Sequence, residues 1–213
     1  MPSLQLTFAL HYKPQWVYAF VISFSLIVAS ACGQADGQNY FPLADGAKWE
    51  YTGRYSSADG RQFAVRGEIR VDGETLIHGQ RYFKYVITTD LSSVLGTPKT
   101  QEDVRYYRAA PDGIYFLTGR NTDAPERLEL PLPVQIGVKW LNGAAEGRVE
   151  RAGTIKVGDR EYADCVKVTY TEPSGVHSTE NYLAPGVGII KSVYVNNTEP
   201  KSTIELTLEQ YHL

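Results

Sequence analysis

The octet PLADGAKW, residues 42–49, recurs 91 positions later as PVQIGVKW, residues 133–140. Pro, Gly, Lys and Trp occupy the same four places in both copies. Proline opens a turn and lacks the amide hydrogen that a central strand needs, and glycine permits the tight bend that follows it. Trp49 and Trp140 then begin strands with a large apolar side chain. The repeat therefore predicts that each octet leads the chain into a β-sheet.

The two tryptophans are expected to be structural anchors at equivalent buried places. Trp49 should pack on the strand at residues 82–87, and Trp140 should pack on the strand at residues 166–170. Each would then be surrounded by the strands that follow its own octet. The competing hypothesis is that one of them is an exposed platform for a ligand.

Short strands are predicted along the rest of the chain from residue 40. Apolar and polar residues alternate there in runs that turn signals interrupt about every ten residues, as in sandwiches and barrels. Asp72-Gly73 and Asn142-Gly143 are examples, since Asp-Gly and Asn-Gly supply the positive φ of tight hairpins. Residues 203–209 alternate most regularly, which is typical of an antiparallel strand with one face in water. The sequence predicts an all-β, antiparallel fold without a helical period.

The expected organisation is a signal peptide over residues 1–31, a short tether over 32–39 and one β domain over 40–213. Two similar modules, about 40–120 and 130–212, would share this domain. Because no long linker separates them, we expect one shared curved sheet, a sandwich or a partial barrel rather than two independent cores.

The signal peptide is predicted from an apolar run over residues 16–31, which is short for a membrane-spanning helix and has no basic cluster after it. Ala29-Ser30-Ala31 fits cleavage by an ordinary signal peptidase. Together with Cys32 it also resembles the lipobox of bacterial lipoproteins, although Ala29 stands where Leu is usual. That resemblance implies lipidation of Cys32, and Gly33 in the next position implies the outer membrane.

The chain contains a second cysteine, Cys165, and this leaves another use for Cys32 open. Export leads to an oxidising compartment, where a Cys32–Cys165 disulfide is feasible. Lipidation and this disulfide exclude each other because both need the same sulfur. Alternation with Lys167 and Thr169 predicts that Cys165 lies on the more polar face of its strand, and no neighbouring base indicates a reactive thiol.

Two longer stretches resemble a known group of proteins. YFPLADGAKWEY, residues 40–51, is similar to the opening of the mature domain in a widespread group of uncharacterised bacterial envelope lipoproteins and secreted proteins. NYLAPGVGIIKSVY, residues 181–194, is similar to their closing hairpin. The two matches bracket most of the mature chain. The resemblance implies an antiparallel β domain in the cell envelope, and it implies no activity because the group has none established.

Several function classes are disfavoured by composition and spacing. The chain has 21 basic and 24 acidic residues, so it carries no basic footprint for nucleic acid. The histidines and cysteines lack the spacing of metal ligands, and we expect no metal and no cofactor. No G-x-S-x-G motif is present, and the neighbouring Glu102 and Asp103 would point to opposite faces of a strand. We therefore expect a protein that is not an enzyme.

The strongest positive signal is a group of tyrosines and arginines on neighbouring strands. Tyr and Arg are enriched at binding hot spots. The same mixture also arises where tyrosines pack inward and arginines cover them. The candidate binding surface consists of Tyr82, Tyr85, Arg105, Tyr106, Tyr107 and Arg108.

The resulting expectation is an exported, lipid-anchored, non-catalytic envelope protein that acts in binding or assembly. It would face the periplasm or the cell surface from the outer membrane, or else be a soluble secreted or periplasmic protein. Its partners would be the membrane, through the lipid, and an envelope protein or an apolar ligand. As an alternative it would be a carrier or receptor for a small apolar ligand in a β cavity; a hydrolase is less favoured. A mostly apolar cavity of about 300 Å³ or more would favour the carrier.

Overall fold

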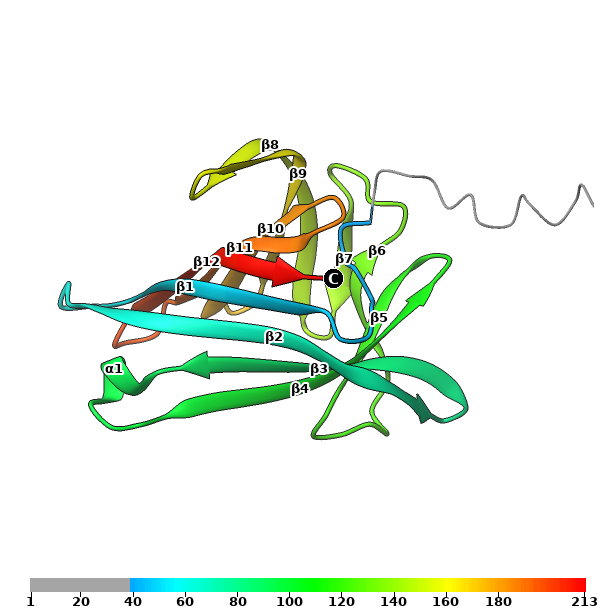
Figure 1. Ribbon diagram of the computed structural model, residues 1–213, viewed down its shortest axis with the longest axis horizontal. Helices are drawn as coiled ribbons and strands as arrows, with labels where there is room; N and C mark the ends of the chain where they lie inside the picture. Colours follow the sequence, from blue (N-terminus) through cyan, green and yellow to red (C-terminus); the bar gives the residue numbers. More distant parts are fainter. Residues whose placement is uncertain (1–38) are drawn as a thin grey trace, which may run out of the picture. The chain divides into compact units, whose positions relative to one another are not determined.

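The computed structural model describes residues 39–213, which form one antiparallel sheet and a single short helix (Figure 1). This confirms the all-β, antiparallel prediction. The signal peptide, Cys32 and nearly all of the tether lie outside the described residues. The elements are β1 (Lys48–Ser57), β2 (Gln62–Ile77), β3 (Gln80–Asp90), α1 (Ser92–Leu95), β4 (Thr100–Ala110), β5 (Gly113–Thr118), β6 (Arg127–Pro131), β7 (Lys139–Asn142), β8 (Ala145–Val157), β9 (Arg160–Thr171), β10 (His177–Ala184), β11 (Gly188–Asn196) and β12 (Ser202–His212).

The strands follow one another around the sheet in the order β6-β5-β4-β3-β2-β1-β12-β11-β10-β9-β8-β7. The first and last strands pair, from Lys48 opposite His212 to Ser57 opposite Ser202. The two edges are β6 and β7, which are consecutive in the chain and lie near each other without forming a ladder. Of the three predicted arrangements, the sheet is therefore the partial barrel, and its open seam lies between β6 and β7.

The two octets make the same backbone hydrogen bonds. The amide of Gly46 donates to the carbonyl of Val71 (3.2 Å), and the amide of Gly137 donates to the carbonyl of Val149 (2.8 Å). In return, the amide of Val71 donates to the carbonyl of Ala47 (2.8 Å), and the amide of Val149 donates to the carbonyl of Val138 (3.1 Å). Both glycines have a positive φ, 77° and 88°, which explains why glycine recurs at this place. Each octet therefore fixes its strand against the second strand of its own half of the sheet, where one half is β1–β6 and the other is β7–β12.

Both tryptophans are buried where they were predicted. Trp49 is 3% exposed, and its ring lies 6.2 Å from that of Tyr85 on β3. Trp140 is 9% exposed, and its ring lies 5.9 Å from that of Tyr170 on β9. The prediction that each packs on the strands of its own half is confirmed, and neither tryptophan is an exposed platform.

One predicted turn is wrong. Asp72-Gly73 does not end a strand, because β2 continues through it to Ile77. The pairing of β2 with β3 shifts register between Val71 and Glu74, and Gly73 has a φ of 83°. The positive φ that usually makes a hairpin here makes a β-bulge, which twists the long strand without reversing it.

Cys165 is also placed differently from the prediction. It is 1% exposed, and its neighbour Val166 is buried as well. The pairing of β8 with β9 shifts register on both sides of Gly153, which lies opposite Cys165, and Asp164 has a φ of 53°. These bulges interrupt the alternation of inward and outward side chains, so Cys165 and Val166 are both buried. Burial raises the pKa of the Cys165 thiol.

α1 is the only helix among residues 39–213, and it spans four residues. No helix in that part of the chain has the length and apolar character needed to cross a membrane.

The two ends of the sheet differ in packing. At one end, inward-facing side chains form a dense core that includes Trp49, Tyr85 and Ile190. The described part of the chain begins at this closed end: the amide of Gly186 donates to the carbonyl of Asn39 (2.8 Å), and the buried Tyr40 packs into the core.

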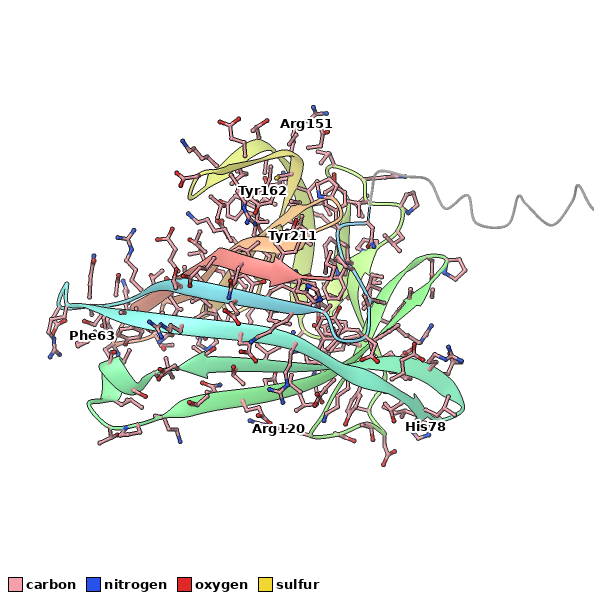
Figure 2. The ribbon with its side chains drawn as sticks, viewed as in Figure 1. Phe63, His78, Arg120, Arg151, Tyr162 and Tyr211 are labelled. Carbon is pink, nitrogen blue, oxygen red and sulfur yellow. The ribbon has the colours of Figure 1, made fainter. Side chains whose placement is uncertain are left out.

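At the opposite end, side chains on the same inner face are half-buried. Tyr55 pairs with Phe63 on one side and with Ile204 on the other, and Tyr194 opposite Ile204 is 36% exposed. Figure 2 shows Phe63 at this open end. The sheet is therefore a cup with a packed base and an open mouth.

Candidate functional site: an interior cavity

A cavity of about 420 Å³ lies inside the curved sheet, above the packed base. Its volume falls within the range of about 300–1,000 Å³ that is usual for small-molecule sites. Apolar atoms make up the larger share of its wall. The apolar lining comes from strands of both halves and includes Trp49, Tyr51, Ile69, Tyr85, Ile87, Phe116, Ile189 and Leu206. The interior of this cup is thus not filled by its own side chains.

Strand β4 contributes a row of polar side chains to the wall. Asp103, Arg105 and Tyr107 are two residues apart, so they share the inner face. Nε of Arg105 donates to Oδ2 of Asp103 (3.0 Å), and Nη1 donates to the hydroxyl of Tyr107 (3.3 Å). The guanidinium lies 5.2 Å from the ring centre of Phe116, a cation–π contact. Stacking and two hydrogen bonds hold this guanidinium in place against the wall.

The open seam carries a second polar group. Glu129 on β6 is 6% exposed. The hydroxyl of Tyr170 donates to the Glu129 backbone carbonyl (2.7 Å) and contacts its Oε1 (3.0 Å), and Nδ2 of Asn142 donates to Oε2 (3.2 Å). Within residues 39–213, no Lys, Arg or His nitrogen lies within 4.0 Å of this carboxylate. Neutral donors from β7 and β9 thus hydrogen-bond to a buried acidic residue and bridge the gap between the edges.

The hydroxyls of Tyr170 and Tyr107 in the wall stay protonated. Burial raises the pKa of Tyr170 well above its ordinary value, and the charge of Glu129 raises it further. The pKa of Tyr107 is raised in the same direction, first by burial and then by Glu129. Both hydroxyls therefore keep their protons at neutral pH.

The six residues of the candidate binding surface are separated by the sheet. Tyr85, Arg105 and Tyr107 lie on the inner face and line the cavity. Tyr106 is half-buried and, as the neighbour of Tyr107, faces away from it. The sequence therefore indicated three of the cavity residues and added others from the far side of the same strands.

Tyr82 and Arg108 take part in a different contact. The hydroxyl of Tyr82 donates to Oε1 of Glu126 (2.6 Å). Nε of Arg108 donates to the same oxygen (2.5 Å), and its Nη2 contacts Oε2. Glu126 lies just before β6 and none of the three lines the cavity. This group attaches the chain that leads into the edge strand to β3 and β4.

Glu129, Tyr170 and Asn142 were missed by the sequence analysis. In RLELPL, Glu129 stands between two leucines, and strict alternation would turn it to solvent. The register of β5 with β6 shifts between Ile114 and Tyr115, so Glu129 and Leu130 are both buried. A charged residue inside an otherwise apolar edge strand was the available signal.

No family model and no curated protein matches the chain. Three solved structures match the chain at low sequence identity. One, from Bacteroides fragilis, is described as an exported protein with a YmcC-like fold (16% identity, TM-score 0.46, 81% of this chain and 98% of that one). A structure from Parabacteroides distasonis is described as a lipoprotein (13% identity, TM-score 0.35, 83% of this chain and 100% of that one). The third is described as a LolA superfamily protein from Nitrosomonas europaea (8% identity, TM-score 0.33, 81% of this chain and 87% of that one).

Proposed function

We propose that this protein is an exported, lipid-anchored and non-catalytic carrier or receptor, which binds a small and predominantly apolar ligand inside its β cup. One observation carries the proposal: a cavity of about 420 Å³ with a mostly apolar wall lies in the interior of the sheet. A purely structural role would be served by filling that interior, because close packing stabilises a fold. The base of the same cup is filled in that way.

The wall also has the composition of a binding site. Large aromatic rings offer area to an apolar body, and a few polar groups converge among them, as in small-molecule sites generally. Arg105 and Tyr107 are fixed by each other and by Asp103 and Phe116, so little side-chain order would have to be gained on binding. The site is thus preorganised for a ligand.

The anchor is tested by replacing Cys32. Cys32→Ser should move the protein from the membrane fraction of its cells to the soluble fraction, while Cys165→Ser should leave it in the membrane. Intact-mass analysis of the wild type should show an acylated Cys32. A soluble wild type with an unmodified Cys32 would contradict the anchor without touching the cavity proposal.

The ligand is tested by filling the cavity. Ala145 on β8 lines it, whereas Ala64 on β2 is exposed, so Ala145→Phe and Ala64→Phe make the same change at contrasting places. Wild type and Ala64→Phe purified from the native envelope should carry a small molecule that organic extraction and mass spectrometry detect. Ala145→Phe should carry much less. Equal amounts in all three proteins would exclude the cavity as the site.

A further inference from the structure

We infer that the ligand is an uncharged amphiphile, in which a hydrogen-bond acceptor such as an amide or ester carbonyl meets Arg105 and Tyr107 and the remainder is apolar. This inference rests on the proposed function and names the ligand class of the same cavity. It follows from which hydrogen bonds the polar wall leaves open and from the sign of its charge.

The polar wall has hydrogen-bond donors that are not used by other protein groups. A guanidinium carries five N–H groups, and two of those of Arg105 are used by Asp103 and Tyr107. Its side chain is 35% exposed and lines the cavity. The Tyr107 hydroxyl accepts from Arg105, and within residues 39–213 it donates its own hydrogen to no other group. A ligand atom that accepts hydrogen bonds would meet both.

The charge of the wall opposes an anionic ligand. Asp103 already neutralises Arg105 at 3.0 Å, and the buried Glu129 adds a second carboxylate without an ion-pair partner. A carboxylate or phosphate on the ligand would be the third anion around one guanidinium, in a site where low polarity strengthens repulsion. Two further charged residues line the wall. Glu68 pairs with Lys48 (3.0 Å), and Arg127 is a second guanidinium, whose charge is screened by water because its side chain is exposed.

A carbonyl resolves both constraints, because it accepts from Arg105 and Tyr107 without adding charge. A cationic group would find the two carboxylates but would also face the unused N–H donors of Arg105. An entirely apolar ligand would leave those donors without an acceptor after water is displaced, which is unfavourable. The apolar body would lie against the rings of Trp49 and Tyr85 and the aliphatic residues beside them.

The test uses Nile red, an uncharged dye with a carbonyl acceptor whose fluorescence rises in apolar surroundings, displaced from the full-length protein at pH 7. The competitors are octanamide, octanoate and octylammonium, which share one chain length. Octanamide should displace the dye at concentrations at least about tenfold below those of octanoate, because octanoate adds an anion beside the carboxylates of Asp103 and Glu129. Tighter binding of octanoate or octylammonium than of octanamide would overturn the inference.

Variants test which residues produce the preference for octanamide over octanoate. Arg105→Met should weaken octanamide about tenfold, whereas Arg61→Met, at an exposed turn, should not. Asp103→Asn and Glu129→Gln should each improve octanoate relative to octanamide, whereas Glu209→Gln, on an exposed position, should not. Glu129 is buried, so Glu129→Gln can impair folding. Asp103→Asn on the cavity wall tests the same charge effect independently. An unchanged preference in every folded variant would overturn the charge explanation. If the dye binds to no form of the protein, the proposed function itself fails.

Discussion

The same octet serves two different boundaries of the sheet. After the first octet, β1 pairs with β2 on one side along nine positions and with β12 on the other side along ten positions. After the second, β7 pairs only with β8, and its other edge faces β6 without a ladder. The local structure of the octets is therefore equivalent, whereas their surroundings are a closed boundary in one case and an open seam in the other.

The indole N–H groups show what this difference means. Nε1 of Trp49 donates to the carbonyl of Val187 (2.6 Å), in the turn between β10 and β11. Nε1 of Trp140 donates to the carbonyl of Leu128 (3.0 Å), on β6 across the open seam. Each tryptophan packs on its own half and hydrogen-bonds to the other half. At the seam, however, side chains of Trp140, Tyr170 and Asn142 take the place of a backbone ladder.

The largest effect is expected from removing either tryptophan. Trp49→Ala and Trp140→Ala should each lower the free energy of unfolding by about 3–5 kcal/mol, from lost transfer energy and the cavity left behind. Because the octets are equivalent, the two losses should be similar, as measured by urea unfolding. A loss for Trp140→Ala that is less than half of that for Trp49→Ala would show that the open seam contributes little to the fold.

A smaller effect should separate the two boundaries. Tyr51 donates from the closed boundary to the carbonyl of Ile189 (2.9 Å), whereas Tyr170 donates at the seam to Glu129. Tyr170→Phe should lower stability by about 1–3 kcal/mol, because it leaves a buried carboxylate short of a donor. Tyr51→Phe should lower it by about 0.5–1.5 kcal/mol. Tyr162→Phe, whose hydroxyl makes no hydrogen bond within residues 39–213, serves as the control, and equal losses for Tyr51→Phe and Tyr170→Phe would remove the distinction.

The smallest effect concerns the contact that precedes the edge strand. The hydrogen bond from Arg108 lowers the pKa of Glu126 below its ordinary value of 4.5. A depressed carboxyl pKa contributes stability that is present above the unfolded pKa and is lost as the pH falls through the folded pKa. Melting temperatures of wild type and Glu126→Gln should therefore differ most near neutral pH and converge below about pH 4.5. A difference that stays constant from pH 7 to pH 3 would show that the charge of Glu126 plays no part.

Much of the fold could be predicted from local signals. Period-two alternation identified the strands, and the repeated octet located Trp49 and Trp140 correctly, because both patterns depend on residues close in sequence. The turn at Asp72-Gly73 and the face of Cys165 were predicted wrongly. In both cases a bulge shifts the register, and a bulge appears only in the pairing of two strands, where two residues of one strand lie opposite one residue of the other.

The cavity was predictable only in part. Arg105 and Tyr107 could be placed on one face of a strand by their spacing. Whether that face pointed inward depended on the curvature of the whole sheet, which also sent Tyr82 and Arg108 to the outside. The meeting of Glu129 with Tyr170 and Asn142 depends on the closure of β6 toward β7 and β9, for which the chain carries no local pattern.

The most direct test of the central claim is a Nile red titration of wild type, Ala145→Phe and Ala64→Phe. Wild type and Ala64→Phe should bind one equivalent of dye with the same affinity and the same blue shift in emission. Ala145→Phe, folded as judged by circular dichroism, should bind at least about tenfold more weakly, because its ring occupies the space that the ligand needs. Equal binding by all three folded proteins would contradict the assignment of the interior cavity as the binding site.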